Sequence, residues 1–315
     1  YSNEFLSIGL GARALGMSGA YVAAVSDATA GYWNPAGLQS VQGKFQVNLM
    51  HSEYFAGIAK YDFGSLAARI DPKSVLGFTV IRFGVDDIPD TSELIDANGN
   101  INYDRITSFS AIDNAFMLSY ARQLSEKLQL GGTFKVIHRK VGEFAKAWGF
   151  GLDAGLRYHS GKWIWAAQLR DASSTFNAWS FNLTESQRKA FNATGNQIPV
   201  NTLERTRPTF VAGIWRNFPL GEKFGLTAEL DLQTTFDGMR NTLIRDKNFS
   251  MSPVLGIEAN YKQMVFLRAG VGNISSQLND AGSGRITTVQ PNIGLGIKIR
   301  NFMLDYALTN IGASV

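Results

Sequence analysis

The chain of 315 residues carries 30 Lys and Arg against 26 Asp and Glu, a modest net charge of +4, and it contains no cysteine. The lack of cysteine excludes a disulfide framework, a thiolate metal site and a thiol nucleophile, and the scattered basic residues give little support for nucleic-acid binding. No window of 18 or more apolar residues predicts a transmembrane helix, but this does not exclude a membrane β-barrel, whose strands alternate apolar and polar residues.

The first distinctive stretch, residues 5–38, reads FLSIGLGARALGMSGAYVAAVSDATAGYWNPAGL. Its run from Gly9 to Ala14 fits the GxGxxA fingerprint of a dinucleotide-binding turn, which requires a βαβ unit around it. Everything downstream is predicted to be antiparallel hairpins. We therefore interpret these glycines as backbone that packs closely inside a barrel.

From residue 44 onward the dominant period of the sequence is two. Apolar residues such as Trp148, Phe150 and Leu152 alternate with glycine and charged residues. Strict alternation predicts half-buried strands. About thirteen are expected, at residues 44–55, 56–70, 75–85, 111–123, 127–140, 145–158, 162–171, 207–217, 222–234, 250–261, 264–274, 287–299 and 301–309.

Short and long connections alternate between these predicted strands. Every second connection is a tight turn, such as DPKS at 71–74 or HSGK at 159–162, whereas most of the others, at 86–110, 172–206, 235–249 and 275–286, are longer. A soluble sandwich or barrel is the alternative, but strands of this length suit a tilted membrane crossing better. The pattern predicts an all-β transmembrane antiparallel β-barrel in a bacterial outer membrane, with the short turns on the periplasmic side.

The same alternation predicts a strand that the sequence does not show. If the short turns are periplasmic, the strand at 301–309 runs outward, and a barrel of the usual bacterial pattern has an even number of strands. We therefore expect about fourteen strands, with a final closing strand beyond Val315.

The segment before the first strand is rich in Gly and Ala. Its sequence GARALGMSGAYVAAVSDATAGYWNPAGL resembles the N-terminal hatch of the long-chain fatty-acid transporter (FadL-like) superfamily. The resemblance is closer to the PorV/PorQ family, outer-membrane components of the type IX secretion system of Bacteroidota, and it extends to HSEYFAGIAKYDFG (51–64) and LSEKLQLGGTFKVI (124–137). It implies that residues 1–43 form a plug inside the lumen and that residues 44–315 form the barrel.

The plug motif has a physical rationale. Asn34-Pro35-Ala36-Gly37 predicts a turn, because proline fixes φ and glycine tolerates positive φ. We expect Asp27 to accept hydrogen bonds from this turn or to pair with a lumenal Arg or Lys. We favour a role in plug folding over ligand gating for the motif residues, which are Gly16, Gly19, Asp27, Trp33, Asn34, Pro35 and Gly37.

Ten charged residues are predicted to face the lumen. Buried charges need partners, so we expect most of them to form cross-strand pairs or to contact the plug; a hydrophilic pore is the alternative. They are Lys135, Arg139, Asp153, Arg157, Glu229, Asp231, Glu258, Arg268, Lys298 and Asp305.

Two of the long loops have a distinctive composition. The loop at 86–110 is acidic, which is typical of a solvated surface, and it lacks the spacing of a calcium loop. The loop at 172–206 carries four aromatic residues that would fold over the barrel mouth or dock another protein. These candidate partner-binding residues are Phe176, Trp179, Phe181 and Phe191.

The sequence offers little support for an enzyme. The three histidines, His51, His138 and His159, lie in separate hairpins without metal-binding spacing, so no metal and no cofactor are expected. No GxSxG elbow is present. A lipid-modifying barrel enzyme is kept as a minor alternative.

We therefore expect a non-enzymatic outer-membrane barrel that binds larger membrane or secreted proteins of a secretion or surface-assembly machinery, in contact with outer-membrane lipid and lipopolysaccharide. The alternative is a passive transporter of hydrophobic small molecules, as in the fatty-acid branch. A hydrophobic transporter should have an apolar lumenal pocket, whereas the inward face is mostly Gly, small polar and charged residues.

Overall fold

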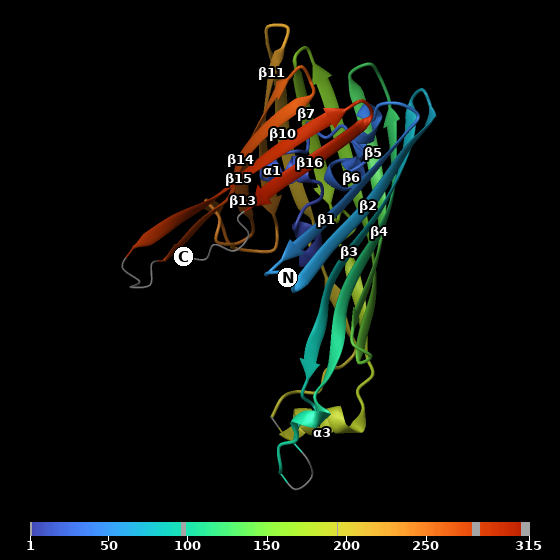
Figure 1. The fold of residues 1–315 in the computed structure, drawn as a ribbon, viewed down its shortest axis with the longest axis vertical. Coiled ribbons are helices and arrows are strands. Elements are labelled where there is room, and N and C mark those ends of the chain that lie inside the picture. The colour runs from blue at the N-terminus through green and yellow to red at the C-terminus, as the bar shows by residue number, and fades with distance from the viewer. Residues whose placement is uncertain (1, 96–98, 194, 279–283, 310–315) are drawn as a thin grey trace.

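The computed structural model describes residues 2–95, 99–193, 195–278 and 284–309 (Figure 1). Within these ranges the chain forms one antiparallel sheet of sixteen strands, of which thirteen follow one another side by side. These thirteen are β1 (Phe45–Tyr54), β2 (Ala59–Asp71), β3 (Ser74–Asp90), β4 (Thr107–Gln123), β5 (Leu128–Val141), β6 (Ala145–Ser160), β7 (Trp163–Arg170), β10 (Thr209–Leu220), β11 (Phe224–Thr235), β13 (Ser250–Tyr261), β14 (Val265–Leu278), β15 (Arg285–Ile299) and β16 (Phe302–Thr309).

The remaining elements are short. Three further strands, β8 (Phe176–Phe181), β9 (Thr202–Arg205) and β12 (Ile244–Arg245), lie beside this path. The helices are α1 (Ala12–Gly16), α2 (Ala30–Trp33) and α3 (Glu185–Ala193), with 3₁₀ turns at Glu4–Ser7, Pro35–Ser40 and Tyr103–Arg105. Within the described ranges, no helix has the length and apolarity needed to cross a membrane.

The prediction of an all-β antiparallel fold is confirmed, and each of the thirteen predicted segments corresponds to one strand of the path. The long loops are shorter in the structure than the sequence predicts. β3 continues to Asp90 and β4 begins at Thr107, so Asp86, Asp87 and Asp90 lie in a strand. A register shift between Val85 and Ile88 lets the pairing resume beyond the predicted end.

The predicted loop at 172–206 is also partly ordered as sheet. β8 pairs with the first half of β6 and with β9. Because β7 pairs only with the second half of β6, β6 has a different neighbour at each end. The three short strands β8, β9 and β12 account for the difference between the thirteen strands predicted within the sequence and the sixteen described. Together with the long β3 and β4, they extend one side of the sheet toward α3 (Figure 1).

Burial is inverted relative to a soluble protein. Along β6 the outward residues Trp148, Phe150 and Leu152 are exposed, whereas Asp153 and Arg157 on the inward face are 4% and 2% exposed. Soluble proteins almost never bury charges while exposing apolar side chains in this systematic way. The outward surface is therefore suited to lipid.

The outward apolar surface has the height of a membrane. The run from Trp148 to Tyr158 extends about 33 Å along β6 at about 3.3 Å per residue, which is about 25 Å of membrane thickness at a tilt of about 40°. The outward apolar surface ends at a row of polar residues that crosses the first strands. Each of these residues faces outward and is paired directly with the next one in the row. This row consists of His51, Asp62, Arg82, Asn114 and His138, followed by Trp148. The adjacent row is apolar apart from a glycine and consists of Leu49, Gly64, Val80, Phe116, Val136 and Phe150.

The N-terminal segment, blue in Figure 1, packs against the inward face of the curved sheet. α1 contacts β14, β15 and β16, whereas Pro35–Ser40 contacts β3, β4, β5 and β6. Two inward glycines show how closely the backbones approach. A Cβ atom at Gly131 would lie 2.4 Å from the carbonyl carbon of Pro35, and one at Gly270 would lie 2.2 Å from that of Met17. Any larger residue at these two positions would displace the segment.

Candidate functional site in the sheet interior

The Asn34–Gly37 stretch forms a capped turn. The Asn34 side chain accepts a hydrogen bond from the Ala36 N–H at 3.1 Å and donates to the carbonyls of Val22 and Leu156, at 3.0 and 3.3 Å. Pro35 occupies the first position of the 3₁₀ turn, where its missing N–H costs nothing. Asn34 thus ties the turn both to the preceding segment and to β6.

Asp27 has partners other than those expected. Its carboxylate accepts hydrogen bonds from the N–H and hydroxyl of Thr29 and from the Tyr21 hydroxyl, the last at 2.8 Å. It therefore closes a local turn at residues 27–29, just before α2, and in the described residues no hydrogen bond joins it to the Asn34 turn or to a lumenal cation. Trp33 donates from its indole N–H to the Leu10 carbonyl at 2.8 Å, and its ring lies edge-on to Tyr21.

The motif glycines lie in tight places. A Cβ atom at Gly16 would lie 2.9 Å from the backbone of Gly294 on β15, and one at Gly37 would lie 2.5 Å from the Val25 side chain. Gly19 has a positive φ of 82°. These three residues are therefore fixed by the packing of the segment.

Two buried carboxylates of β11 hold the N-terminal segment by its backbone. Glu229 accepts hydrogen bonds from the N–H groups of Ala23 and Ala24 at 2.6 and 2.7 Å, and Asp231 accepts from those of Tyr21 and Val22 at 2.9 and 3.2 Å. Four successive amides therefore point at two acidic side chains.

Arg157 on β6 donates hydrogen bonds to the N-terminal segment, whereas Glu229 and Asp231 accept them. Its guanidinium donates to the Ala23 carbonyl and to the Ser40 hydroxyl, both at 2.7 Å. Arg157 and Glu229 thus bind the same residue from two different strands.

A second cluster joins α1 to the last strands. Glu258 on β13 accepts hydrogen bonds from Arg13 at 2.8 and 2.9 Å and from Arg268 at 2.6 Å. Arg268, whose side chain is fully buried, also donates to Asp305 on β16 at 2.6 Å. The chain of alternating charges crosses four elements. Lys298 takes no part in it, since it lies exposed near the end of β15.

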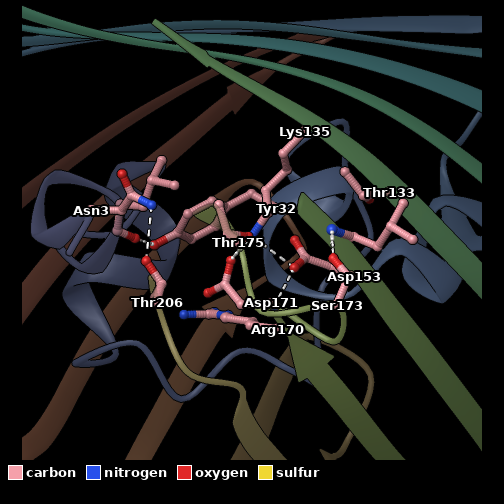
Figure 2. A network of polar contacts seen from close by, with 12 residues as sticks. Asn3, Tyr32, Thr133, Lys135, Asp153, Arg170, Asp171, Ser173, Thr175 and Thr206 are labelled. Atoms are coloured by element: carbon pink, nitrogen blue, oxygen red, sulfur yellow. Dashed lines mark hydrogen bonds and ion pairs between the residues drawn. The ribbon is translucent and has the colours of Figure 1, made fainter. Parts of the chain in front are cut away.

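A third cluster lies between β5, β6 and the stretch after β7. Figure 2 shows the Lys135 ammonium between Asp153 and Asp171, at 2.8 and 2.6 Å. Asp171 also accepts a hydrogen bond from the Thr175 hydroxyl, and its own N–H donates to Asp153 at 2.7 Å. Residues 171–175 are thereby folded against the inward face of the sheet.

The N-terminus meets this cluster. The Asn3 amide donates to the Thr206 hydroxyl at 3.0 Å and accepts from Asn177 at 2.8 Å. Tyr32 donates from its hydroxyl to the Leu6 carbonyl. Burial raises the pKa of the Tyr32 phenol, although the charge of Arg170 opposes the shift, so this phenol remains a neutral donor.

Two cavities remain in the interior next to these contacts. The larger, of about 530 Å³, lies between the N-terminal segment and the strands from β10 to β15, and the smaller, of about 180 Å³, lies beside the Lys135 cluster. Both are lined by Tyr32 and Arg170. The larger volume is in the range of sites for small organic molecules.

The lining of the larger cavity is mixed. Apolar side chains from the N-terminal segment and the sheet, Ile8, Leu15, Val22, Trp33, Val211 and Val254, lie opposite polar ones such as Gln233, Thr235 and Ser252. The Arg170 guanidinium lies 4.9 Å from the ring centre of Tyr32 and 5.4 Å from that of Trp33. Such a cavity can hold an apolar body and a hydrogen-bonding group at the same time.

Arg170, Asp171 and Tyr32 were missed in the sequence. The available signal was the alternation of the strand at 162–171, which places Gln168 and Arg170 opposite its apolar face. No local pattern reveals that Tyr32 lies across from them.

The four aromatic residues of the predicted loop are spread over two elements. Trp179 on β8 donates to Glu204 at 3.1 Å, and Arg139 lies over its ring at 5.1 Å while pairing with Asp113 at 2.8 Å. Phe176 packs beside Phe150, and Phe181 stacks on Trp179. Phe191 lies on α3. Their role in docking a partner stays a prediction.

The described ranges contain no group of three or more His, Asp and Glu side chains that could hold a metal ion. His51 instead bonds Asp62 at 2.6 Å on the outward face.

Comparison with solved structures shows that the chain shares the fold of several channels and transporters of hydrocarbons and of a FadL homologue. Over 96% of its length the chain superposes on 94% of the CymD monoaromatic hydrocarbon channel (TM-score 0.55, 16% identity) and on 92% of the Ralstonia pickettii toluene transporter TbuX (TM-score 0.55, 15% identity). A Pseudomonas aeruginosa FadL homologue matches 95% of the chain over 90% of its own length (TM-score 0.52, 10% identity). No protein-family model and no curated protein matches the chain.

These comparisons support the FadL-like part of the sequence resemblance, whereas membership of the PorV/PorQ family is not shown. They also correct the expected function. The solved structures that share this fold are described as channels and transporters of hydrocarbons, so the expectation of a barrel that serves a secretion machinery is wrong. The physical reason for the error is that the inward polar residues were interpreted as favouring partner binding over transport. Four of the charged ones, Arg157, Glu229, Asp231 and Glu258, instead hold the N-terminal segment.

Proposed function

We propose that the chain is an outer-membrane barrel for the passive passage of small hydrophobic molecules, with residues 2–43 as its plug. The observation that carries the proposal is the cavity of about 530 Å³ between this segment and the strands from β10 to β15, in a chain that shares the fold of hydrocarbon channels over nearly its whole length.

The interior provides the elements that passive transport requires. The segment occupies the sheet interior but leaves the cavity beside Trp33, Val211 and Val254, where an apolar molecule can rest. Because the segment is held in the interior by hydrogen bonds and ion pairs, and is joined covalently to the sheet only where the main chain continues into β1, small displacements of it can connect neighbouring cavities. No chemical step is needed, which agrees with a non-enzymatic role.

Blocking the cavity tests the proposal. Val254→Trp places a large ring in the cavity, whereas Leu255→Trp on the same strand points outward and serves as the matched control. We expect uptake of toluene by cells that depend on this barrel to fall at least fivefold in Val254→Trp and to change less than twofold in Leu255→Trp. Equal uptake by the two variants, at equal amounts of folded protein in the outer membrane, would contradict transport through this cavity.

A further inference from the structure

Six short turns lie together at one end of the sheet, the end opposite α3 (Figure 1). They share this end because each strand of the path is antiparallel to its neighbours. The turns span residues 72–73, 124–127, 161–162, 221–223, 262–264 and 300–301. Each turn contains one Lys or Arg, and their only acidic residues are Glu126 and Glu222. We refer to the six cations as the basic rim, which consists of Lys73, Lys127, Lys162, Lys223, Lys262 and Arg300.

The basic rim is not neutralised by ion pairs. All six side chains belong to exposed residues, and in the described part of the chain none of them forms an ion pair with a carboxylate. The connections at the opposite end of the sheet contain more acidic than basic residues. The two ends of the sheet therefore differ in charge, and the end with the short turns is the positive one.

One arginine lies on the outward face at the level of this rim. Arg216 on β10 pairs directly with Trp163, the first residue after the turn at 161–162. Its guanidinium carbon lies 4.6 Å from the ring centre of Trp163 and 4.8 Å from that of Phe218. Within the described ranges its side chain makes no hydrogen bond or ion pair, and its buried Nε has no partner. The sheet thus holds an unpaired guanidinium against two aromatic rings.

This arrangement fits the headgroup region of a bilayer. Aromatic side chains are enriched at the interface between membrane and water, and basic residues near the membrane surface attract anionic lipids. A guanidinium can donate two parallel hydrogen bonds to a phosphate, whereas the rings beside Arg216 offer no such acceptor. The phosphate of a lipid headgroup therefore satisfies Arg216 while its side chain stays on the outward face.

The distribution of the cations favours lipid over a protein partner. The six turns follow one another from β2 to β16, so the basic rim extends across nearly the whole width of the sheet. A protein docked at one place would reach only a few of these residues, whereas the lipids that surround the sheet reach all of them. Arg216 also shares its face with Trp163, on the lipid-facing side of the sheet.

We propose that the basic rim and Arg216 bind anionic phospholipid headgroups, such as that of phosphatidylglycerol, in the leaflet that the short turns face. Arg216 holds a phosphate, and the rim supplies the attraction for lipids of negative charge. With the short turns on the periplasmic side, this leaflet is the periplasmic one. Lipid binding at the rim does not depend on what passes through the interior, so loss of toluene uptake and loss of lipid binding are separate outcomes.

Native mass spectrometry of the full chain measures this preference. The protein is delipidated in detergent and mixed with equimolar dioleoyl phosphatidylglycerol and zwitterionic dioleoyl phosphatidylcholine, and the retained lipids are counted. We expect about fivefold more phosphatidylglycerol than phosphatidylcholine at low salt, and a smaller ratio at high salt because salt screens exposed charges. Equal retention of the two lipids at low salt would overturn the proposal.

Substitutions test the basic rim and Arg216 separately. Replacement of all six rim residues by glutamine should remove most of the preference, and the fold should persist because these residues are exposed and unpaired. Arg216→Gln alone should lower the ratio about twofold, through loss of one phosphate contact. Arg82→Gln is the matched control and should leave the ratio unchanged, since Arg82 faces outward near the other end of the apolar surface and lies 3.9 Å from Asp62. A ratio equal to that of the parent in the six-residue variant or in Arg216→Gln would contradict the proposal.

Competition identifies the source of the phosphate. Inorganic phosphate at the concentration of the lipid should not displace phosphatidylglycerol from the parent protein. Displacement by inorganic phosphate would show a site for free anions, and tighter binding of lipopolysaccharide would show a site for the other leaflet. An acidic protein that co-purifies at one copy per chain and excludes phosphatidylglycerol would show a protein-docking surface. Each of these three results overturns the proposal.

Discussion

The carboxylate of Glu229 accepts a hydrogen bond from the backbone N–H of Ala23 at 2.6 Å, although 206 residues separate them in the chain. A side chain of a central strand thus holds the N-terminal segment by its main chain. Because the contact uses the backbone of Ala23, the hydrogen bond itself does not depend on a functional group of the Ala23 side chain.

We expect Glu229→Gln to loosen the segment. The amide of glutamine has a single oxygen for the two N–H groups and no charge, and a charge-assisted hydrogen bond contributes about 1.5–3 kcal/mol. The free energy of unfolding in detergent should fall by about that amount. Glu222→Gln, in the exposed turn between β10 and β11, is the control and should leave the unfolding curve unchanged. Identical curves for the two variants would show that the carboxylate does not hold the segment.

Two adjacent glycines on β5 allow the effect of close packing to be tested separately from the effect of backbone flexibility. Gly131→Ala would place its methyl group 2.4 Å from the Pro35 carbonyl carbon, whereas at Gly132 the nearest atom is 3.6 Å away. We expect Gly131→Ala to release the N-terminal segment, measured as faster proteolysis near residues 34–37, and Gly132→Ala to behave as the parent protein. Equal protection in both variants would contradict the packing.

Arg268 should be the most sensitive lumenal charge. Its fully buried side chain pairs with Glu258 and Asp305, and removal of one partner from a buried ion pair costs about 3–5 kcal/mol. Arg268→Met should therefore lower the free energy of unfolding by about that amount, while the exposed Lys298→Met should have little effect. A loss of under about 1 kcal/mol in Arg268→Met would indicate that the cluster is open to water.

The lipid-facing surface is tested at Leu152, in the middle of the outward run of β6. Leu152→Lys should destabilise the protein in a bilayer by about 2–4 kcal/mol, as expected for lysine near the membrane midplane, whereas a lysine near the interface costs about 0–1 kcal/mol. Ser160→Lys, at the last residue of β6, is the control for position. If both variants unfold alike in phospholipid vesicles, this face does not contact hydrocarbon.

The sequence predicted those parts of the fold that depend on local alternation. Trp148, Leu152 and Arg157 reveal their faces through the period of two, which requires no knowledge of neighbouring strands. The pairing of β8 with β6 was not predictable in this way, because it depends on which strand β7 leaves uncovered.

The interior was predictable only in part. Seven inward charges are buried as the alternation indicates, namely Lys135, Asp153, Arg157, Glu229, Asp231, Glu258 and Arg268. Their partners are not encoded locally, since Ala23 and Asp171 join them across 206 and 36 residues. The position of Tyr32 beside Arg170 likewise arises only once the segment is folded into the sheet.

The contacts of the N-terminal segment constrain the order of assembly. Residues 12–16 touch β14, β15 and β16, whereas residues 35–40 touch β3 to β6, so about forty residues at the beginning of the chain contact strands from both ends of the sheet. Removal of this piece from the folded sheet would break its hydrogen bonds to Glu229, Arg157 and Glu258. We therefore expect the segment to be in place while the strands assemble around it, so that it serves as a template for the curvature of the sheet.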